Sequence, residues 1–305
     1  MKLLHVCIIK ADTCGGLLDG FDRWFRSPHS EDYSLFDPLC LVGPNGAGKS
    51  QFLQVLTEIF QSIYHTCLPG EERIDGNPDL QFEIEYLIQP EGEDTPVHVS
   101  ISRQSVERRK PKLTIIKKNE DNWESCDPAS PSTHKLLPHK VIGYTSGENE
   151  TLSLPFLISR SGYAEEVGRK ALSKGGQEEV ADTRLMLIDY GTNLEVIVSN
   201  LLTNNGDQLE ALIKDARLKD LHSFRCVIQL AHRAAPKLPG KKGIQLTAEL
   251  KKYIDNLQRC ATCYSYDAKE ERYVFDFWVN EETQLAFNYF WQSTLELYSS
   301  LHKLS

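Results

Sequence analysis

The chain has 305 residues, of which 40% are hydrophobic and 25% are charged, and its formal net charge is −9. This length and apolar content suffice for one large domain or two ordinary ones, each with a packed core. The excess of negative charge repels nucleic acid, so any DNA contact would need a local basic patch or a partner. Because the sequence contains no run of eighteen or more apolar residues, we expect no membrane span.

The N-terminal segment, residues 1–10, is apolar with an early lysine but lacks a small-residue cleavage site. We therefore expect a strand over residues 3–9 and no signal peptide. The eight cysteines are scattered along the chain and do not form the dense framework of a small secreted domain. Both features favour a cytoplasmic protein.

A glycine-rich loop follows a short apolar run at residues 39–42, which predicts a strand. The next eight residues match G-x-x-x-x-G-K-[ST] without a gap: Gly43, Pro44, Asn45, Gly46, Ala47, Gly48, Lys49 and Ser50. The glycines permit backbone dihedrals that turn successive amides inward and form an anion cradle. The pattern predicts a P-loop for ATP, in which Lys49 reaches the β- and γ-phosphates and the Ser50 hydroxyl binds Mg²⁺.

We accordingly expect Lys49 to be the catalytic residue and the nucleotide contacts to extend from Gly43 to Gln51. A chance glycine-rich turn, or a degenerate loop that has lost its ligand, is the alternative. The flanking strand and helix argue against chance. Small GTPases are disfavoured because no guanine-reading Asn-Lys-x-Asp tetrapeptide occurs in the sequence.

The residues after the loop predict a helix whose positive end would point at the phosphates. Its apolar positions recur at helical spacing, and the polar ones are left for the other face. The apolar set is Phe52, Leu53, Leu56, Ile59 and Phe60, and the polar set is Gln51, Gln54, Glu58 and Gln61. We expect Leu68-Pro69-Gly70 to end the helix.

Three segments with alternating or β-branched residues come next, at residues 80–88, 97–101 and 113–116. Proline-containing turns separate them, so we expect a three-stranded antiparallel ribbon. A basic run on this ribbon could contact DNA phosphates, although a solvated hairpin face is the favoured alternative. The run comprises Arg103, Arg108, Arg109, Lys110, Lys112, Lys117 and Lys118.

The octet GPNGAGKS resembles the P-loop of the ABC, SMC and RecF group of ATPases. Three segments, residues 14–22, 38–54 and 141–156, are similar to bacterial AAA-family ATPases associated with restriction systems, and the resemblance extends along the chain. It implies an α/β fold with an ABC-ATPase-like P-loop NTPase first lobe and an antiparallel β-subdomain. It also implies ATP hydrolysis coupled to head-to-head pairing, with a second copy or with a partner chain that supplies a signature loop, and to DNA or a nuclease in phage defence.

The same resemblance implies a Walker B aspartate followed by a glutamate, a switch histidine and a Ser-Gly-Gly-Gln-like signature loop. Residues 185–189 alone have the Walker B outline, but Tyr190 stands where the glutamate is expected. Asp189 is therefore either an Mg²⁺ ligand or, as we favour, a strand-end residue before a helix. Residues 145–148 are either a degenerate signature or, as we favour, a strand end and loop, because Pro155 limits the helix that a signature opens.

In resembling proteins these motifs lie towards the C-terminus, so we expect the C-terminal ATPase lobe to be absent from this chain. The alternative to a complete ATPase is an ATP-gated assembly module that needs another chain for hydrolysis. A nucleotide kinase is disfavoured because the sequence shows no Arg-rich lid.

We expect residues 1–160 to form the nucleotide-binding lobe and residues 161–305 to form a mixed α/β region. In the second region we expect helices over residues 193–202, 209–216, 247–257 and 281–304, and strands over residues 224–230 and 273–279. Cys260 and Cys263 have zinc-knuckle spacing, but zinc needs two more ligands. The sequence has no second close pair, and although Cys226, His222 and His232 could be invoked, buried or idle cysteines are favoured.

Overall fold

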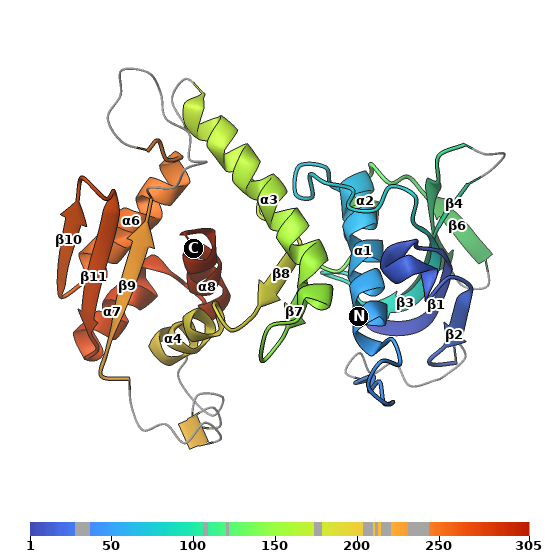
Figure 1. Cartoon of the computed structure of the whole chain (residues 1–305), viewed down its shortest axis with the longest axis horizontal. Helices are drawn as coiled ribbons and strands as arrows, with labels where there is room; N and C mark the ends of the chain where they lie inside the picture. The colour runs from blue at the N-terminus through green and yellow to red at the C-terminus, as the bar shows by residue number, and fades with distance from the viewer. Residues whose placement is uncertain are drawn as a thin grey trace. The chain divides into compact units, whose positions relative to one another are not determined.

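The structure is a computed structural model of the chain, shown in Figure 1. It describes residues 1–27, 37–105, 109–119, 122–173, 179–203, 210, 213–214, 221–230 and 244–304. The fold is mixed α/β, as the sequence predicts, and the chain divides into two compact units. The first comprises Met1–Tyr144, Asn149–Tyr163 and Ala181–Leu187, and the second comprises Thr145–Glu148, Ala164–Val180 and Ile188–Ser305.

A six-stranded antiparallel sheet forms the base of the first unit, with strand order β2-β1-β3-β4-β5-β6. The predicted first strand and three-stranded ribbon are confirmed, as β1 and β3 to β5 of this wider sheet. Val6 pairs with Ile84, and Ile84 pairs with Ile101, so the three lie in one row on the buried face. The strands are β1 (Lys2–Lys10), β2 (Phe21–Trp24), β3 (Gln81–Ile88), β4 (Val97–Gln104), β5 (Lys112–Asn119) and β6 (Asn122–Cys126).

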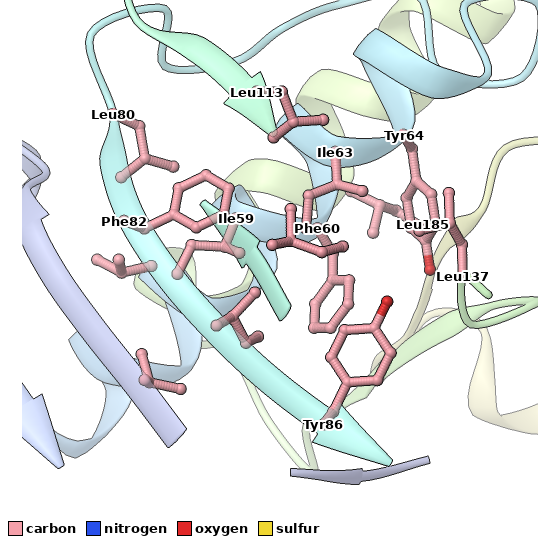
Figure 2. Packing of buried hydrophobic residues seen from close by; sticks show 14 of the residues in the cluster. Ile59, Phe60, Ile63, Tyr64, Leu80, Phe82, Tyr86, Leu113, Leu137 and Leu185 are labelled. Carbon is pink, nitrogen blue, oxygen red and sulfur yellow. The ribbon is translucent and has the colours of Figure 1, made fainter. Parts of the chain in front are cut away.

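Helix α1 (Lys49–Cys67) packs on the buried face of the sheet, which confirms the helix predicted after the glycine-rich loop. Figure 2 shows Ile59 and Phe60 of α1 beside Phe82 and Tyr86 of β3. Burying these side chains contributes about 1.5–3 kcal/mol each to the stability of the folded state. Two further short elements belong to this unit: the 3₁₀ turn η1 (Thr13–Gly16) and helix α2 (Pro131–His134).

The polar face of α1 is buried as well, although its residue pattern predicts an exposed face. Gln54, Glu58 and Gln61 all lie in the interior, where the turn at Thr13 and the segment from Glu72 to Pro78 cover them. Nearby polar groups supply the hydrogen bonds that this burial requires. Gln54 Nε2, for example, donates to Glu58 Oε1 at 3.0 Å.

Arg103, the first residue of the basic run for which a solvated hairpin face is favoured over DNA contact, is buried on β4. Its guanidinium donates to both carboxylate oxygens of Asp75, at 3.1 Å and 2.9 Å, and to the carbonyl of Pro78. Arg103 therefore holds the segment after α1 in place and is not available to DNA. Arg108 lies outside the described residues, and Arg109, Lys110 and Lys112 are exposed.

Strands β7 (Val141–Tyr144) and β8 (Leu185–Ile188) form a separate two-stranded sheet. The amide of Val141 donates to the carbonyl of Arg184 at 2.8 Å, and the amide of Thr145 donates to the carbonyl of Ile188 at 3.0 Å. Because both partners advance along the chain in the same direction, β7 and β8 run parallel.

Helix α3 (Glu150–Leu172) connects the two parallel strands. The expectation that Pro155 limits this helix is wrong, since α3 continues for 23 residues with Pro155 inside it. The proline falls near the N-terminal end, where its missing N–H removes only the hydrogen bond to the carbonyl of Thr151. The predicted boundary at residue 160 therefore lies inside a continuous helix.

The strand predicted at residues 39–42 is absent, because these residues have no regular secondary structure. Val42, at its end, is 94% exposed. None of the described strands pairs with this segment, and an extended segment without a hydrogen-bonding neighbour does not become part of a sheet.

The second unit contains a three-stranded antiparallel sheet with strand order β10-β11-β9 and an aromatic core. The predicted strands at residues 224–230 and 273–279 and the helices at residues 193–202 and 247–257 are confirmed. Strand β10 is not predicted, and the helix expected at residues 209–216 lies mostly outside the described residues. The elements are α4 (Asn193–Thr203), β9 (Ser223–Gln229), α6 (Ala248–Cys260), β10 (Cys263–Asp267), β11 (Arg272–Trp278), α7 (Glu281–Phe290) and α8 (Thr294–Leu304).

The single helix predicted over residues 281–304 is in fact two helices, α7 and α8. Trp291 between them is extended, with φ −130° and ψ 118°, and its indole N–H donates to Ser300 Oγ at 3.0 Å. Ser293 starts α8, since its Oγ accepts from the amide of Glu296 at 3.2 Å and the Glu296 carboxylate accepts from the amide of Gln292 at 2.8 Å. Burial of Trp291 and the cap at Ser293 together break the helix.

A substitution at Gly76 tests how tightly the buried polar side chains of α1, here called the buried polar layer, are packed. The layer consists of Gln54, Glu58 and Gln61. Its φ is +69°, and a Cβ there would lie 2.3 Å from Gln61 Oε1, whereas Gly92 has a φ of +86° and no atom within 4 Å. We expect Gly92→Ala to lower the free energy of unfolding by about 1 kcal/mol through backbone strain alone. Gly76→Ala should cost about 1–3 kcal/mol more, because it displaces a buried amide. Urea titration of both variants measures the difference, and equal losses would show that the layer tolerates a methyl group.

Candidate functional site

The glycine-rich loop forms an exposed bend that leads directly into α1. Gly46 and Gly48 have φ of 83° and 86°, in the left-handed region, and Gly48 is the residue that caps the helix. The amide of Phe52 donates to the Gly48 carbonyl at 2.8 Å, which is the first hydrogen bond of the helix. The loop therefore has the helix that the motif predicts on one side, without the predicted strand on the other.

The backbone conformation explains the glycines at positions 46 and 48. Residues other than glycine are strained at such φ values. At Gly46 a Cβ would meet no atom within 4 Å, so the requirement there comes from the backbone alone. At Gly48 a Cβ would lie 3.8 Å from Leu17 and 3.9 Å from Leu18, which places the residues after η1 beside the start of the helix.

The side chain of Lys49 folds back over the loop. Its ammonium group donates to the carbonyls of Gly43 and Pro44, at 2.9 Å and 2.8 Å. The charge is thus held at the bend, next to the first amides of α1, which have no acceptor within the helix. Ser50 and Gln51 occupy the next two helical positions and are half-buried. The motif residues consequently place a cation, free amides and a hydroxyl together at one helix N-terminus.

A hydrogen-bonded turn behind the loop fixes the segment that carries Leu17 and Leu18. Thr13 Oγ1 donates to Glu58 Oε2 at 2.7 Å, and Asp12 adopts a left-handed φ of 55°. Burial raises the pKa of Glu58, against the effect of its hydrogen bonds. This turn is not among the predicted elements, although the pair Gly15-Gly16 after a strand is a turn signal.

Asp189 follows β8 and belongs to the second unit, whereas the glycine-rich loop belongs to the first. Its Oδ1 accepts from the amides of Gly191 and Thr192, at 2.9 Å and 3.0 Å, and from the Thr192 hydroxyl at 3.1 Å. These are the contacts of a residue that organises the turn into α4. They agree with the favoured sequence interpretation, a strand-end residue before a helix.

Two substitutions of Asp189 separate this local role from Mg²⁺ binding. Asp189→Ala should lower the free energy of unfolding by about 1 kcal/mol, because the turn loses its acceptor. Asp189→Asn keeps an acceptor oxygen, so it should be close to neutral for stability and for the Mg²⁺ dependence of nucleotide binding. Urea titration and calorimetric titration at several Mg²⁺ concentrations measure the two effects. A normal stability with lost Mg²⁺ dependence in Asp189→Asn would identify a metal ligand instead.

The candidate signature at residues 145–148 is the loop between β7 and α3. The Thr145 hydroxyl donates to the Gly147 carbonyl at 2.7 Å, and Asn149 Oδ1 accepts from the amide of Leu152 at 3.1 Å at the start of α3. The strand end and loop favoured from the sequence are therefore what the structure contains.

Cys260 and Cys263 do not form a metal centre with other described residues, among which no group of three or more His, Cys, Asp or Glu side chains could hold a metal ion. Burial raises the pKa of the Cys260 thiol to about 12, which keeps it protonated. Cys263 is exposed at the start of β10, and its thiol donates to Asp276 Oδ2 at 3.7 Å. His232 lies outside the described residues.

Within the described residues, no helix is long and apolar enough to cross a membrane. Comparison of the chain with protein-family models, with curated proteins and with solved structures finds no match. The chemistry of the loop and of its surroundings is therefore the basis for assigning a function.

Proposed function

We propose that the chain binds ATP with Mg²⁺ through residues 43–51 and is a P-loop ATPase whose first unit corresponds to an ABC- or RecF-like first lobe. One observation carries the proposal: an uninterrupted G-x-x-x-x-G-K-S motif is an exposed bend at a helix N-terminus, with its lysine folded over it. Helix N-termini with free amides and a nearby cation are ready-made sites for phosphate.

The contacts of Lys49 suggest how the loop would take a triphosphate. Lys49 now donates to two neutral carbonyl oxygens, on Gly43 and Pro44. Exchange of these acceptors for phosphate oxygens replaces neutral hydrogen bonds with charge-assisted ones, which are about twice as strong. The Ser50 hydroxyl would hold Mg²⁺, and the amides of residues 45–50 would donate to the phosphate oxygens. In the transfer reaction Lys49 would stabilise the charge that develops on the phosphate oxygens.

The Walker B candidate at residues 185–189 is not followed by the glutamate that would activate water for hydrolysis. Tyr190, which is 77% exposed, stands in the position of the expected glutamate. The carboxylate of Asp189 before it is occupied by the turn into α4. These observations favour the alternative form of the proposal, an ATP-gated assembly module that depends on another chain for hydrolysis.

The proposal extends to partners of the kind that the resemblance implies. The loop is exposed from Gly43 to Ala47, which suits a site completed by a second copy or a partner chain that supplies a signature loop. A DNA or nuclease partner in a cytoplasmic restriction or phage-defence system belongs to the same proposal, with Arg109, Lys110 and Lys112 as the exposed cations of the ribbon.

Calorimetric titration of the whole chain with ATP, ADP, AMP and adenosine tests the proposal. Affinity should fall in that order, because the contacts are made to phosphates and Mg²⁺. Equal affinity for ATP and AMP, or no binding of either, would refute a triphosphate site. Phosphate release then distinguishes the two forms: Mg²⁺-dependent turnover by the isolated chain supports an ATPase, and binding without turnover supports an assembly module.

A further inference from the structure

A charged cluster joins the start of β1 and the end of β2 to the segment that leads into the glycine-rich loop. The Arg26 guanidinium donates to the carboxylate of Asp37 and, at 2.6 Å, to its main-chain carbonyl. It also donates to the Leu3 carbonyl at 3.1 Å, where the register of β1 shifts between Leu3 and His5. The Lys2 ammonium lies 3.4 Å from the same Asp37 carboxylate. We call Lys2, Arg26 and Asp37 together the Asp37 clamp.

The Asp37 clamp is largely shielded from solvent. The side chains of Lys2 and Arg26 are 3% and 12% exposed, and that of Asp37 is 35% exposed. The hydrogen bond from Arg26 lowers the pKa of Asp37 to about 2, so the carboxylate is ionised at neutral pH. Several charge-assisted hydrogen bonds with little access for water fix the geometry more firmly than a single surface ion pair does.

The segment between the clamp and the loop, residues 38–42, has few other attachments. Among the described residues, none forms a main-chain hydrogen bond with this segment. Val42 is 94% exposed, whereas Leu41 is half-buried and packs against the core of the first unit. Two side-chain contacts, at Asp37 and Leu41, therefore fix the path of the chain before Gly43, a role that a neighbouring strand has within a sheet.

The path of this segment matters for the proposed site because Gly43 and Pro44 follow it directly, and Lys49 contacts their carbonyls. A site that is ordered before its ligand arrives loses less conformational entropy on binding, and its affinity is correspondingly higher. Ordering the backbone of a single residue changes an equilibrium constant by about tenfold. Release of residues 38–42 should therefore have a measurable effect on affinity.

We propose that Asp37 and Arg26 are positioning residues of the nucleotide site, which hold the chain before Gly43 in the conformation that binds a triphosphate. The inference rests on the proposed function and adds two residues outside the motif. Neither residue contacts the nucleotide in this proposal. The carboxylate of Asp37 instead assists the binding of an anion by keeping Arg26 and the loop segment together.

Calorimetric titration of the whole chain with Mg²⁺-ATP separates positioning from electrostatics by the sign of the change. Asp37→Ala removes a negative charge, which by electrostatics alone would strengthen the binding of an anion. Because the clamp is lost, we expect the affinity to fall about tenfold instead. Asp37→Asn keeps an acceptor oxygen for Arg26, so it should show a smaller loss in the same direction, with less risk to folding.

A double-mutant cycle tests whether Asp37 and Arg26 act through one contact. Arg26→Ala should weaken ATP binding about as much as Asp37→Ala does. The double variant should bind no more weakly than Arg26→Ala, because the second substitution removes a contact that is already lost. Additive losses would show that the two residues act separately and would overturn the clamp.

Arg225→Ala is the matched control for Arg26→Ala. Arg225 and Asp276 form another Arg–Asp pair, with hydrogen bonds of 2.6 Å and 3.0 Å, in the second unit. This variant should leave the affinity for ATP unchanged. Urea titration of each variant verifies that the protein is folded under the conditions of the binding measurement.

Cleavage by chymotrypsin without nucleotide measures the clamp independently of ATP. The protease cuts after leucine, and it requires the surrounding chain to leave its fixed path. Cleavage after Leu39 or Leu41, identified by mass spectrometry, should be about tenfold faster in Asp37→Ala than in the wild type. Arg225→Ala should be cleaved at the wild-type rate.

The two measurements distinguish failure of this inference from failure of the proposed function. Unchanged cleavage in Asp37→Ala, or unchanged or tighter ATP binding by this variant, would overturn the positioning role while the wild type still binds ATP. Faster cleavage in Asp37→Ala together with no ATP binding by the wild type would refute the proposed function, and the role of the clamp in binding with it.

Discussion

Lys49→Ala should bind Mg²⁺-ATP about 100-fold more weakly than the wild type, with little change in the free energy of unfolding. A hydrogen bond to a charged group is worth about 1.5–3 kcal/mol, and a 100-fold change in affinity corresponds to about 2.7 kcal/mol. Stability should change by less than about 0.5 kcal/mol, because the two carbonyls that Lys49 contacts, on Gly43 and Pro44, are exposed and can bond to water.

Lys112→Ala is the control for Lys49→Ala, since Lys112 is an exposed lysine on β5 with the same charge. It should leave the affinity for ATP unchanged in calorimetric titration. Comparable losses in both variants would indicate a general electrostatic effect and would count against a phosphate contact by Lys49. An unchanged affinity in Lys49→Ala would remove the basis of the proposed site.

Trp291→Ala should produce the largest loss of stability, about 3–5 kcal/mol, confined to the second unit. The indole is 1% exposed, packs on Phe287 with a centroid distance of 5.4 Å and donates to Ser300. The core around it contains residues of the second unit only, and the core around α1 contains residues of the first unit only. We therefore expect the substitution to destabilise the core of the second unit and to leave the core of the first unit intact.

Hydrogen–deuterium exchange by peptide measures this confinement. Peptides from β9, β11 and α7 should lose protection in Trp291→Ala, while those from β3 and α1 keep it, and ATP affinity should stay within about twofold of the wild type. Trp278→Ala is the matched control, because this tryptophan of β11 is 62% exposed. Loss of protection throughout β3 to β5 would show that the units unfold as one.

Elements with a strong local pattern could be predicted from the sequence, and those shaped by distant partners could not. Strand β3 alternates buried and half-buried residues, and α1 follows its motif directly, so both were found. Strands β2, β6 and β10 carry mostly exposed side chains and have no hydrophobic alternation to reveal them. They pair because a neighbouring strand offers its backbone groups, and a single sequence does not display that neighbour.

Two predicted elements, the single helix over residues 281–304 and the strand at residues 39–42, were wrong for different physical reasons. The break between α7 and α8 does have a local signal, the capping box Ser293-Thr-Leu-Glu296, which the apolar periodicity of the region concealed. The strand expected at residues 39–42 has the right composition but pairs with none of the strands in the described part of the chain, and composition alone cannot supply a partner.

In the candidate site, too, features with a local sequence pattern could be predicted and features that depend on distant residues could not. The motif identified the residues of the bend and its helix. It could not identify the two carbonyls that Lys49 contacts or the turn held by Thr13 and Glu58, because these depend on backbone geometry and on residues 45 positions apart. Asp189 was placed correctly at a strand end, where the Asp-x-x-Thr spacing is that of a local turn.

The parallel pairing of β7 and β8 has a consequence for the kinetics of folding. Its first hydrogen bond joins Val141 to Arg184, which are 184 − 141 = 43 positions apart, whereas β3 to β6 pair with their neighbours in sequence. Closing the longer loop costs more chain entropy before any contact forms. Strands β3 to β6 should therefore assemble before β7 pairs with β8 during refolding, and Ala181–Leu187 should become protected after them.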